Sequence, residues 1–92
     1  MQITDVRLRK VSANESKLKA LCSIVFDDMF VVHELRVVEG IKGLFVAMPR
    51  RKTAEGEFKD QAHPITAEAR DMIQKTVLAA YHEMELKESV SV

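Results

Sequence analysis

The sequence predicts an α+β fold in which a four- to five-stranded antiparallel sheet is followed by one amphipathic helix. Residues 2–48 contain short apolar stretches separated by turn-forming residues, which is typical of strands. Residues 67–84 carry apolar side chains at spacings of three and four, which is typical of a helix. With 92 residues, 47% hydrophobic and 30% charged, the chain has the composition of a globular protein and the length of one domain, so we expect a single domain over residues 1–92.

The first half of the chain is predicted to form the sheet. Val6 and Leu8 alternate with Arg7 and Arg9, which indicates a strand with one covered face. Pro49 ends the last strand because proline cannot donate to the hydrogen-bond ladder. The predicted elements are strands at residues 2–11, 18–26 and 30–38, an apolar strand covered on both faces at 44–48, and turns at 12–16, 27–28 and 39–43.

The second half is predicted to form a long polar loop at residues 49–62 and then the helix. Loops of this length are uncommon in small domains and are often functional. Thr66 has the properties of an N-cap, and Glu68 places a carboxylate in the first turn. The helix has a single apolar stripe, made of Ala69, Met72, Ile73, Thr76, Val77, Ala80, Tyr81 and Met84.

The simplest pairing of the strands assigns the side chains of the sheet to two faces. The face predicted to pack on the helix holds Val6, Leu8, Ala20, Cys22, Ile24, Phe26, Val31, Leu35 and Val37, with His33 as a hydrogen-bonded core histidine beside Cys22. The opposite face has an apolar end (Ile3, Val25, Phe30, Val32) and a basic end (Arg7, Arg9, Lys17, Lys19, Arg36). One helix covers one face, so the exposed apolar end and the free strand edges favour a homodimer.

The sequence carries no signal of catalysis, cofactor binding or metal binding. None of the three histidines lies two to four residues from another histidine or from Cys22, so the short ligand pairs typical of metal sites do not occur. No phosphate-binding glycine motif and no Ser/His/Asp arrangement is indicated. We therefore expect no enzyme activity and no small-molecule substrate. A single cysteine and the lack of a ~20-residue apolar run predict a cytoplasmic protein that does not span a membrane.

The predicted loop begins with three adjacent cations, Arg50, Arg51 and Lys52, and Lys59 lies further along it. Adjacent cations repel one another and suit contacts to phosphates, where released counterions drive binding. Arg7, Arg9, Lys19 and Arg36 form a second candidate patch on the sheet. The formal net charge of the chain is zero, so any nucleic-acid surface must be local. The alternative is a basic triplet that is merely solvated.

Several blocks of residues resemble one known family, the stage V sporulation protein G family, also called SpoVG. The resemblance covers residues 2–84 and rests on Thr4-Asp5-Val6-Arg7-Leu8-Arg9, Phe30-Val31-Val32-His33, Gly43-Leu44-Phe45-Val46-Ala47-Met48-Pro49, Gly56-Glu57-Phe58 and His63-Pro64-Ile65. It implies a dimeric bacterial regulator of sporulation and septation that binds DNA and, in some members, RNA. It also implies that Arg51 and Lys52 contact DNA. Arg50 stands where many relatives have a small polar residue, and Ala54 replaces a frequent proline.

Two hypotheses follow from the sequence. The first is a dimeric nucleic-acid-binding regulator that contacts phosphates through Arg50, Arg51 and Lys52. Such a regulator would need other side chains to recognise a base sequence. Polar helix residues such as Arg70, Gln74 and Lys75 are candidates, and the sequence does not choose among them. The second is a protein-interaction module that acts on the division machinery without binding nucleic acid. Zero net charge favours the second hypothesis, whereas the basic triplet and the resemblance favour the first.

Overall fold

The computed structural model describes residues 2–11 and 17–90, with residues 88–90 described as backbone only. The predicted turn at residues 12–16 lies outside the described residues. The predicted α+β class is confirmed, with four strands in the main sheet. The elements are β1 (Ile3–Lys10), β2 (Leu18–Phe26), β3 (Phe30–Gly40) and β4 (Gly43–Ala47) in an antiparallel sheet of order β1-β2-β3-β4, then β5 (Arg50–Lys52) and β6 (Phe58–Asp60) in a separate two-stranded sheet, and α1 (Ala67–Val90).

Tight turns join β2 to β3 and β3 to β4. Asp27 and Asp28 reverse the chain with φ angles of 53° and 55°, the left-handed values that hairpin turns between twisted strands require. This turn is tied to β1, because the Asp28 N–H donates to Thr4 Oγ1 at 2.9 Å and the Gln2 N–H donates to Asp27 Oδ1 at 3.1 Å. At the next turn Gly43 has a φ of 122°, where a side chain would strain the backbone. Both predicted reversals are confirmed.

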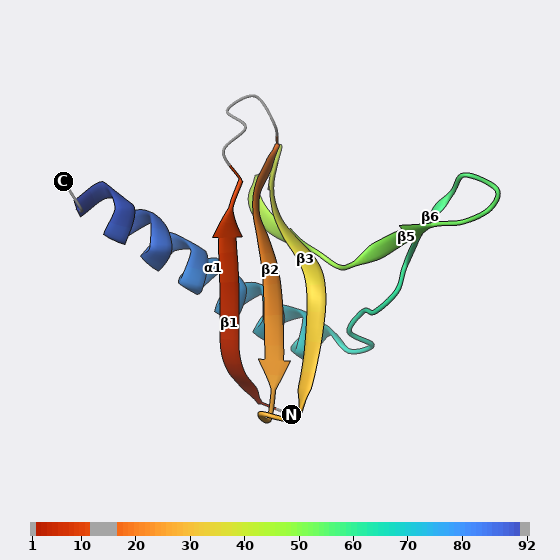
Figure 1. The fold of residues 1–92 in the computed structure, drawn as a ribbon, viewed down its shortest axis with the longest axis horizontal. Coiled ribbons are helices and arrows are strands. Elements are labelled where there is room, and N and C mark those ends of the chain that lie inside the picture. The colour runs from red at the N-terminus through yellow and green to blue at the C-terminus, as the bar shows by residue number, and fades with distance from the viewer. Residues whose placement is uncertain (1, 12–16, 91–92) are drawn as a thin grey trace.

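The helix lies across one face of the main sheet and passes behind it in the view of Figure 1. The sheet and the helix together bury one apolar core, formed by Ala20, Cys22, Ile24, Phe26, Leu35, Val37, Val46, Ile73, Val77 and Tyr81. Every second residue of β2 points into this core, and the helix supplies residues at spacings of four. The predicted apolar stripe is therefore confirmed as the buried face of α1.

The helix begins as predicted and continues further than predicted. The Ala69 N–H donates to Thr66 Oγ1 at 3.0 Å, so Thr66 is the N-cap. The predicted end at residue 84 is wrong, because α1 continues to Val90. Its last turns project past the edge of the sheet beside β1 (Figure 1), where packing no longer requires an apolar stripe. Within residues 2–11 and 17–90, no helix combines the length and the apolar composition needed to cross a membrane.

A β-bulge in β3 reverses the side-chain alternation that the sequence predicted. Cys22 pairs with Leu35 and Ile24 pairs with Val32, so one residue of β2 lies opposite two of β3. Glu34 has a φ of 67°, which accommodates the extra residue. Val32 therefore packs against the core, while Val31 is 44% exposed, the reverse of the prediction. The prediction of a core histidine is also wrong, because His33 is exposed on the opposite face.

Two register shifts and the position of β4 at the edge of the sheet explain other differences from the predicted side-chain faces. A register shift between Ile3 and Asp5 turns Ile3 into the core, not onto the opposite face. A second shift, between Leu18 and Ala20, falls at Lys19. The expectation that residues 44–48 are covered on both faces is wrong: β4 is an edge strand in which Val46 is buried and Phe45 is 41% exposed. An edge strand with apolar side chains on both faces has the same composition as a covered strand.

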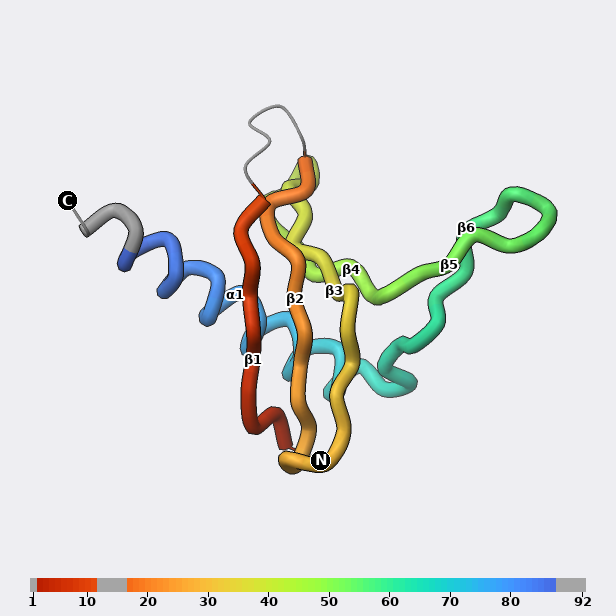
Figure 2. Tube along the Cα trace, in the orientation of Figure 1, coloured from red at the N-terminus to blue at the C-terminus, as the bar shows by residue number. Residues whose placement is uncertain are grey.

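The segment predicted as a long polar loop contains a hairpin that projects from the body of the protein. Strands β5 and β6 pair antiparallel and lie away from the main sheet in both views (Figures 1 and 2). We call residues 50–60 the arm. The radius of gyration is 13.9 Å, against about 12 Å for a compact domain of this length, and the arm and the projecting helix end account for the difference.

Candidate nucleic-acid interface

The arm is held by its own backbone and by one threonine. Near the tip, the Thr53 N–H donates to the Glu57 carbonyl at 2.7 Å, and Thr53 Oγ1 accepts from the Glu57 N–H at 3.2 Å. Gly56 has a φ of 87°, the left-handed conformation that closes the turn. At the base, the Gln61 N–H donates to the Pro49 carbonyl at 2.8 Å. The arm is therefore a defined element, and its side chains have fixed neighbours across the hairpin.

One face of the arm carries two cations directly opposite each other. Arg51 pairs with Lys59 in the register of β5 and β6, and residues in this relation project from the same side of a hairpin. Both residues are exposed, and neither forms an ion pair with a carboxylate among the described residues. Like charges in this position destabilise a hairpin, so this arrangement contributes nothing to folding. It concentrates positive charge on a surface that projects into solvent.

The other face of the arm combines two cations with an aromatic ring. Arg50 and Lys52 lie on this face, and the Arg50 guanidinium carbon lies 5.1 Å from the centre of the Phe58 ring. Phe58 is 61% exposed, and it pairs with Lys52 across the hairpin. Asp60 lies opposite Arg50 and supplies one carboxylate. The hairpin thus gathers all four predicted site residues, Arg50, Arg51, Lys52 and Lys59, on one projecting element.

The second predicted patch is brought together only in part. Arg7, Arg9 and Arg36 lie on the face of the sheet opposite the helix, because Arg9 and Arg36 both pair with Leu21, a neighbour of the buried Cys22. Arg7 forms an exposed ion pair with Asp5, with 3.0 Å between Nε and Oδ2. Lys19 is not part of the patch. It forms an ion pair with Glu39 at 3.1 Å and lines a hollow beside Tyr81 of the helix.

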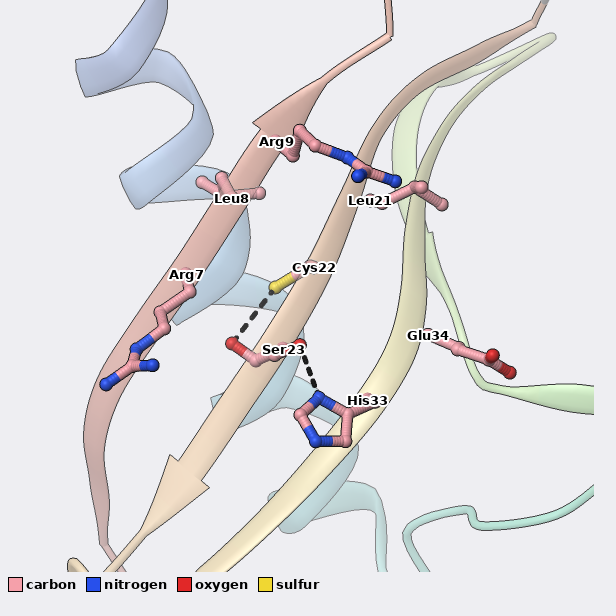
Figure 3. Close-up of a pocket in the computed structure, with 8 residues that line it drawn as sticks. All are labelled: Arg7, Leu8, Arg9, Leu21, Cys22, Ser23, His33 and Glu34. Carbon is pink, nitrogen blue, oxygen red and sulfur yellow. Dashed lines mark hydrogen bonds between the residues drawn. The ribbon is translucent and has the colours of Figure 1, made fainter.

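A shallow groove of about 290 Å³ on this outer face places a serine and a histidine together (Figure 3). Ser23 Oγ lies 2.9 Å from His33 Nδ1, and Arg7 and Arg9 line the same groove. The sequence did not predict this pair, because the bulge in β3 brings His33 to the outer face. No described carboxylate accepts a hydrogen bond from His33. The pair therefore lacks the acidic group that orients the histidine of a catalytic triad.

The remaining candidate residues for chemistry have structural surroundings. Cys22 is 3% exposed, and burial raises the pKa of its thiol to about 11, the opposite of what a reactive cysteine needs. His63 lies before α1, with Nδ1 3.2 Å from the Pro64 carbonyl oxygen. The His82 ring lies edge-on to Tyr81, with 5.9 Å between the ring centres. Among the described residues, no group of three His, Cys, Asp or Glu side chains is placed to hold a metal ion.

Comparison with known proteins places the chain in one family. The SpoVG family model matches residues 1–83. The chain is 59% identical over 81 residues to "Putative septation protein SpoVG" of Caldicellulosiruptor bescii, covering 88% of this chain and 91% of the relative. Proteins of the same name from Clostridium kluyveri (55% identical, 99% and 94% covered) and Clostridium beijerinckii (57% identical, 98% of each covered) are similar over nearly their full length. Matches of this extent and identity show that the chain belongs to the SpoVG family.

Proposed function

We propose that this protein is a dimeric, non-enzymatic regulator that binds nucleic acid through the phosphate-contacting arm. The observation that carries the proposal is the pairing of Arg51 with Lys59 on one exposed face of a projecting hairpin. Two adjacent cations without a described carboxylate partner repel each other, and a phosphate backbone would remove that repulsion. Arg50, Lys52 and Phe58 on the other face would extend the contact, because an aromatic ring beside cations suits stacked bases.

The proposed cellular role is the control of sporulation, septation and gene expression in the cytoplasm. The relatives are named as septation proteins, and contacts to DNA or RNA would connect that role to regulation. Contacts to phosphates position a protein without reading sequence, so the arm alone would give general affinity for DNA and RNA. Sequence preference would come from other groups near the bound strand.

The homodimer is proposed on the basis of exposed apolar surface. At the turn between β2 and β3, Met29 is 84% exposed. Phe30, which pairs with the buried Phe26 on the helix-facing side, is 66% exposed, and Val31 is 44% exposed on the outer face. A second copy that packs this end against its own would remove the patch from water and place two arms on one particle. Two arms would raise affinity for a long strand through effective concentration, without a new contact.

The test is a titration of DNA and of RNA at several salt concentrations, with Arg51→Ala/Lys59→Ala compared with wild type. Each neutralised phosphate on duplex DNA contributes about −0.9 to the slope of log K against log salt. The double variant should bind more weakly, and its slope should be smaller by about 2. Lys87→Ala is the control, because it removes an exposed cation of α1 that pairs with Glu83. Sedimentation of the unbound protein should give the mass of a dimer.

The rival function is a protein-interaction module that acts on the division machinery through the apolar end at Met29 and Phe30. An apolar interface responds little to salt, whereas phosphate contacts weaken steeply as salt rises. Absence of nucleic-acid binding at low salt would overturn the proposal in favour of this rival. An equal loss of nucleic-acid affinity in the arm variant and in the helix control would show that the arm is not the binding site.

A further inference from the structure

A second cluster of cations lies where the arm joins the body. Arg36 of β3, Arg50 of β5 and Arg70 of α1 line one hollow of about 460 Å³ along the free edge of β4. These residues are far apart in the sequence, and only the fold brings them together. Apolar residues, among them Phe45 and Met48, also line the hollow. Among the described residues that line it, Asp60 is the one acidic residue, against three arginines.

None of the three arginines forms an ion pair with a described carboxylate. Arg36 is half-buried, and its partners across the strands, Leu21 and Ala47, are apolar. A half-buried cation without a partner loses hydration and gains no interaction in return. Arg50 lies over the Phe58 ring and leaves Asp60 without an ion pair. Folding alone does not explain why these three side chains are gathered here.

The position of Arg70 makes the hollow still more positive. Arg70 lies in the first turn of α1, and its N–H donates to the Thr66 carbonyl at 3.1 Å. The start of a helix carries the positive end of the helix dipole, so a cation there is placed unfavourably and an anion is favoured. Glu68 is the one acidic residue of that turn, and it does not line the hollow. An anion bound among the three arginines would reverse all of these unfavourable interactions.

We infer that this hollow is a phosphate-binding site in which Arg36, Arg50 and Arg70 hold one phosphate group of a bound nucleic-acid strand. Guanidinium groups bind phosphate oxygens in bidentate geometry, which suits a site built from arginines and not from lysines. Arg50 belongs both to the hollow and to the Phe58 face of the arm, so a strand lying along the arm would continue into the hollow. The inference rests on the proposed nucleic-acid binding and extends it from the arm to the body.

The test uses the whole chain with Arg36→Gln/Arg70→Gln, which leaves the arm unchanged, and Lys87→Gln as the helix control. In the salt titration with a short duplex, the double variant should bind more weakly and lower the slope by about 1, because the hollow neutralises one phosphate. Arg36→Lys should keep the slope, because the charge remains, and should lose affinity severalfold, because the bidentate fork is lost. Circular dichroism and sedimentation would verify that each variant keeps its fold and its oligomeric state.

A second readout separates the sources of the phosphate. The side-chain Nε–Hε resonances of Arg36 and Arg70 should shift on addition of the duplex and should shift much less with a nucleoside triphosphate. Shifts with the triphosphate alone would assign the hollow to a free nucleotide and overturn the strand contact. If the arm variant weakens binding while Arg36→Gln/Arg70→Gln keeps the wild-type affinity and slope, the hollow is not a phosphate site and the proposed function stands. If the wild type binds no nucleic acid, both fail together.

Discussion

Two neighbouring residues of β2 show how burial decides the chemistry of a side chain. Cys22 points into the core and is 3% exposed, whereas Ser23 points to the outer face and contacts His33. The Cys22 Sγ is 3.7 Å from the Ser23 carbonyl oxygen, to which it can donate only a weak hydrogen bond. Cys22 therefore behaves as a small apolar residue, as the sequence predicted, and burial disfavours its thiolate.

The buried thiol predicts a loss of stability at high pH. The pKa of Cys22 is raised from 9.0 to about 11 in the folded protein, so the unfolded thiol ionises first as the pH rises. The raised pKa of the thiol contributes at most about 3 kcal/mol to the free energy of unfolding. This contribution is complete below pH 9 and is lost as the pH approaches 11. Urea unfolding from pH 7 to 11 should show the stability difference between wild type and Cys22→Ala shrinking over this range.

This comparison with Cys22→Ala is needed because Tyr81 titrates in the same range. Burial, and then Glu85, raise the pKa of Tyr81, so its ionisation also destabilises the fold as the pH rises. Tyr81 is present in both proteins, and its effect cancels in the difference. Parallel stability curves for the two proteins would show that the Cys22 thiol ionises as easily in the folded state as in the unfolded state.

At the scale of elements, regular patterns were predictable and local interruptions were not. Strand β2 and helix α1 keep one period along their buried faces, so their core residues could be identified from the sequence. The bulge in β3 adds one residue, and nothing in the composition at His33 and Glu34 marks it. Strands β5 and β6 have three residues each and are mostly charged, too short for alternation to be visible. Their hairpin was therefore predicted as a loop.

Because of the bulge in β3, we expect glycine at position 34 to give a more stable protein than isoleucine, which is unusual for a strand. Its φ of 67° is a left-handed value that a β-branched side chain adopts only with strain. Glu34→Gly should leave the free energy of unfolding nearly unchanged, and Glu34→Ile should lower it by about 1–3 kcal/mol. In an ordinary exposed strand position the order would be reversed, since isoleucine favours strands and glycine weakens them. Thermal and urea unfolding of the two variants would measure this order, and the ordinary strand order would contradict the assigned bulge.

At the scale of the whole molecule, the candidate site depends on contacts that no local pattern records. The basic triplet was visible in the sequence, but the opposition of Arg51 and Lys59 exists only once β5 and β6 pair. The hollow requires β3, the arm and α1 to meet at the edge of β4, so Arg70 could not be chosen from among the polar residues of the helix. The residues proposed to contact phosphate therefore lie outside the apolar core, on elements that the core holds in place.

This separation predicts that the arm can be removed without unfolding the protein. The Pro49 carbonyl and the Gln61 N–H are hydrogen-bonded at 2.8 Å, so an Asn-Gly turn in place of residues 50–60 can join the two ends. No residue of the arm belongs to the apolar core, and a shorter loop costs less entropy to close. The free energy of unfolding in urea should therefore change by no more than about 1 kcal/mol.

Nucleic-acid binding by the same deletion variant should be lost at moderate salt. The deletion removes Arg51 and Lys59 and also takes Arg50 from the hollow, which leaves Arg36 and Arg70 on the body. At low salt, weak binding with a much smaller salt slope should remain, and Arg36→Gln/Arg70→Gln in the deletion background should abolish it. A folded deletion variant with wild-type affinity would move the site away from the arm. A loss of several kcal/mol of stability would show that the arm folds as part of the core, because only then would its removal expose surface that the sheet and the helix need to bury.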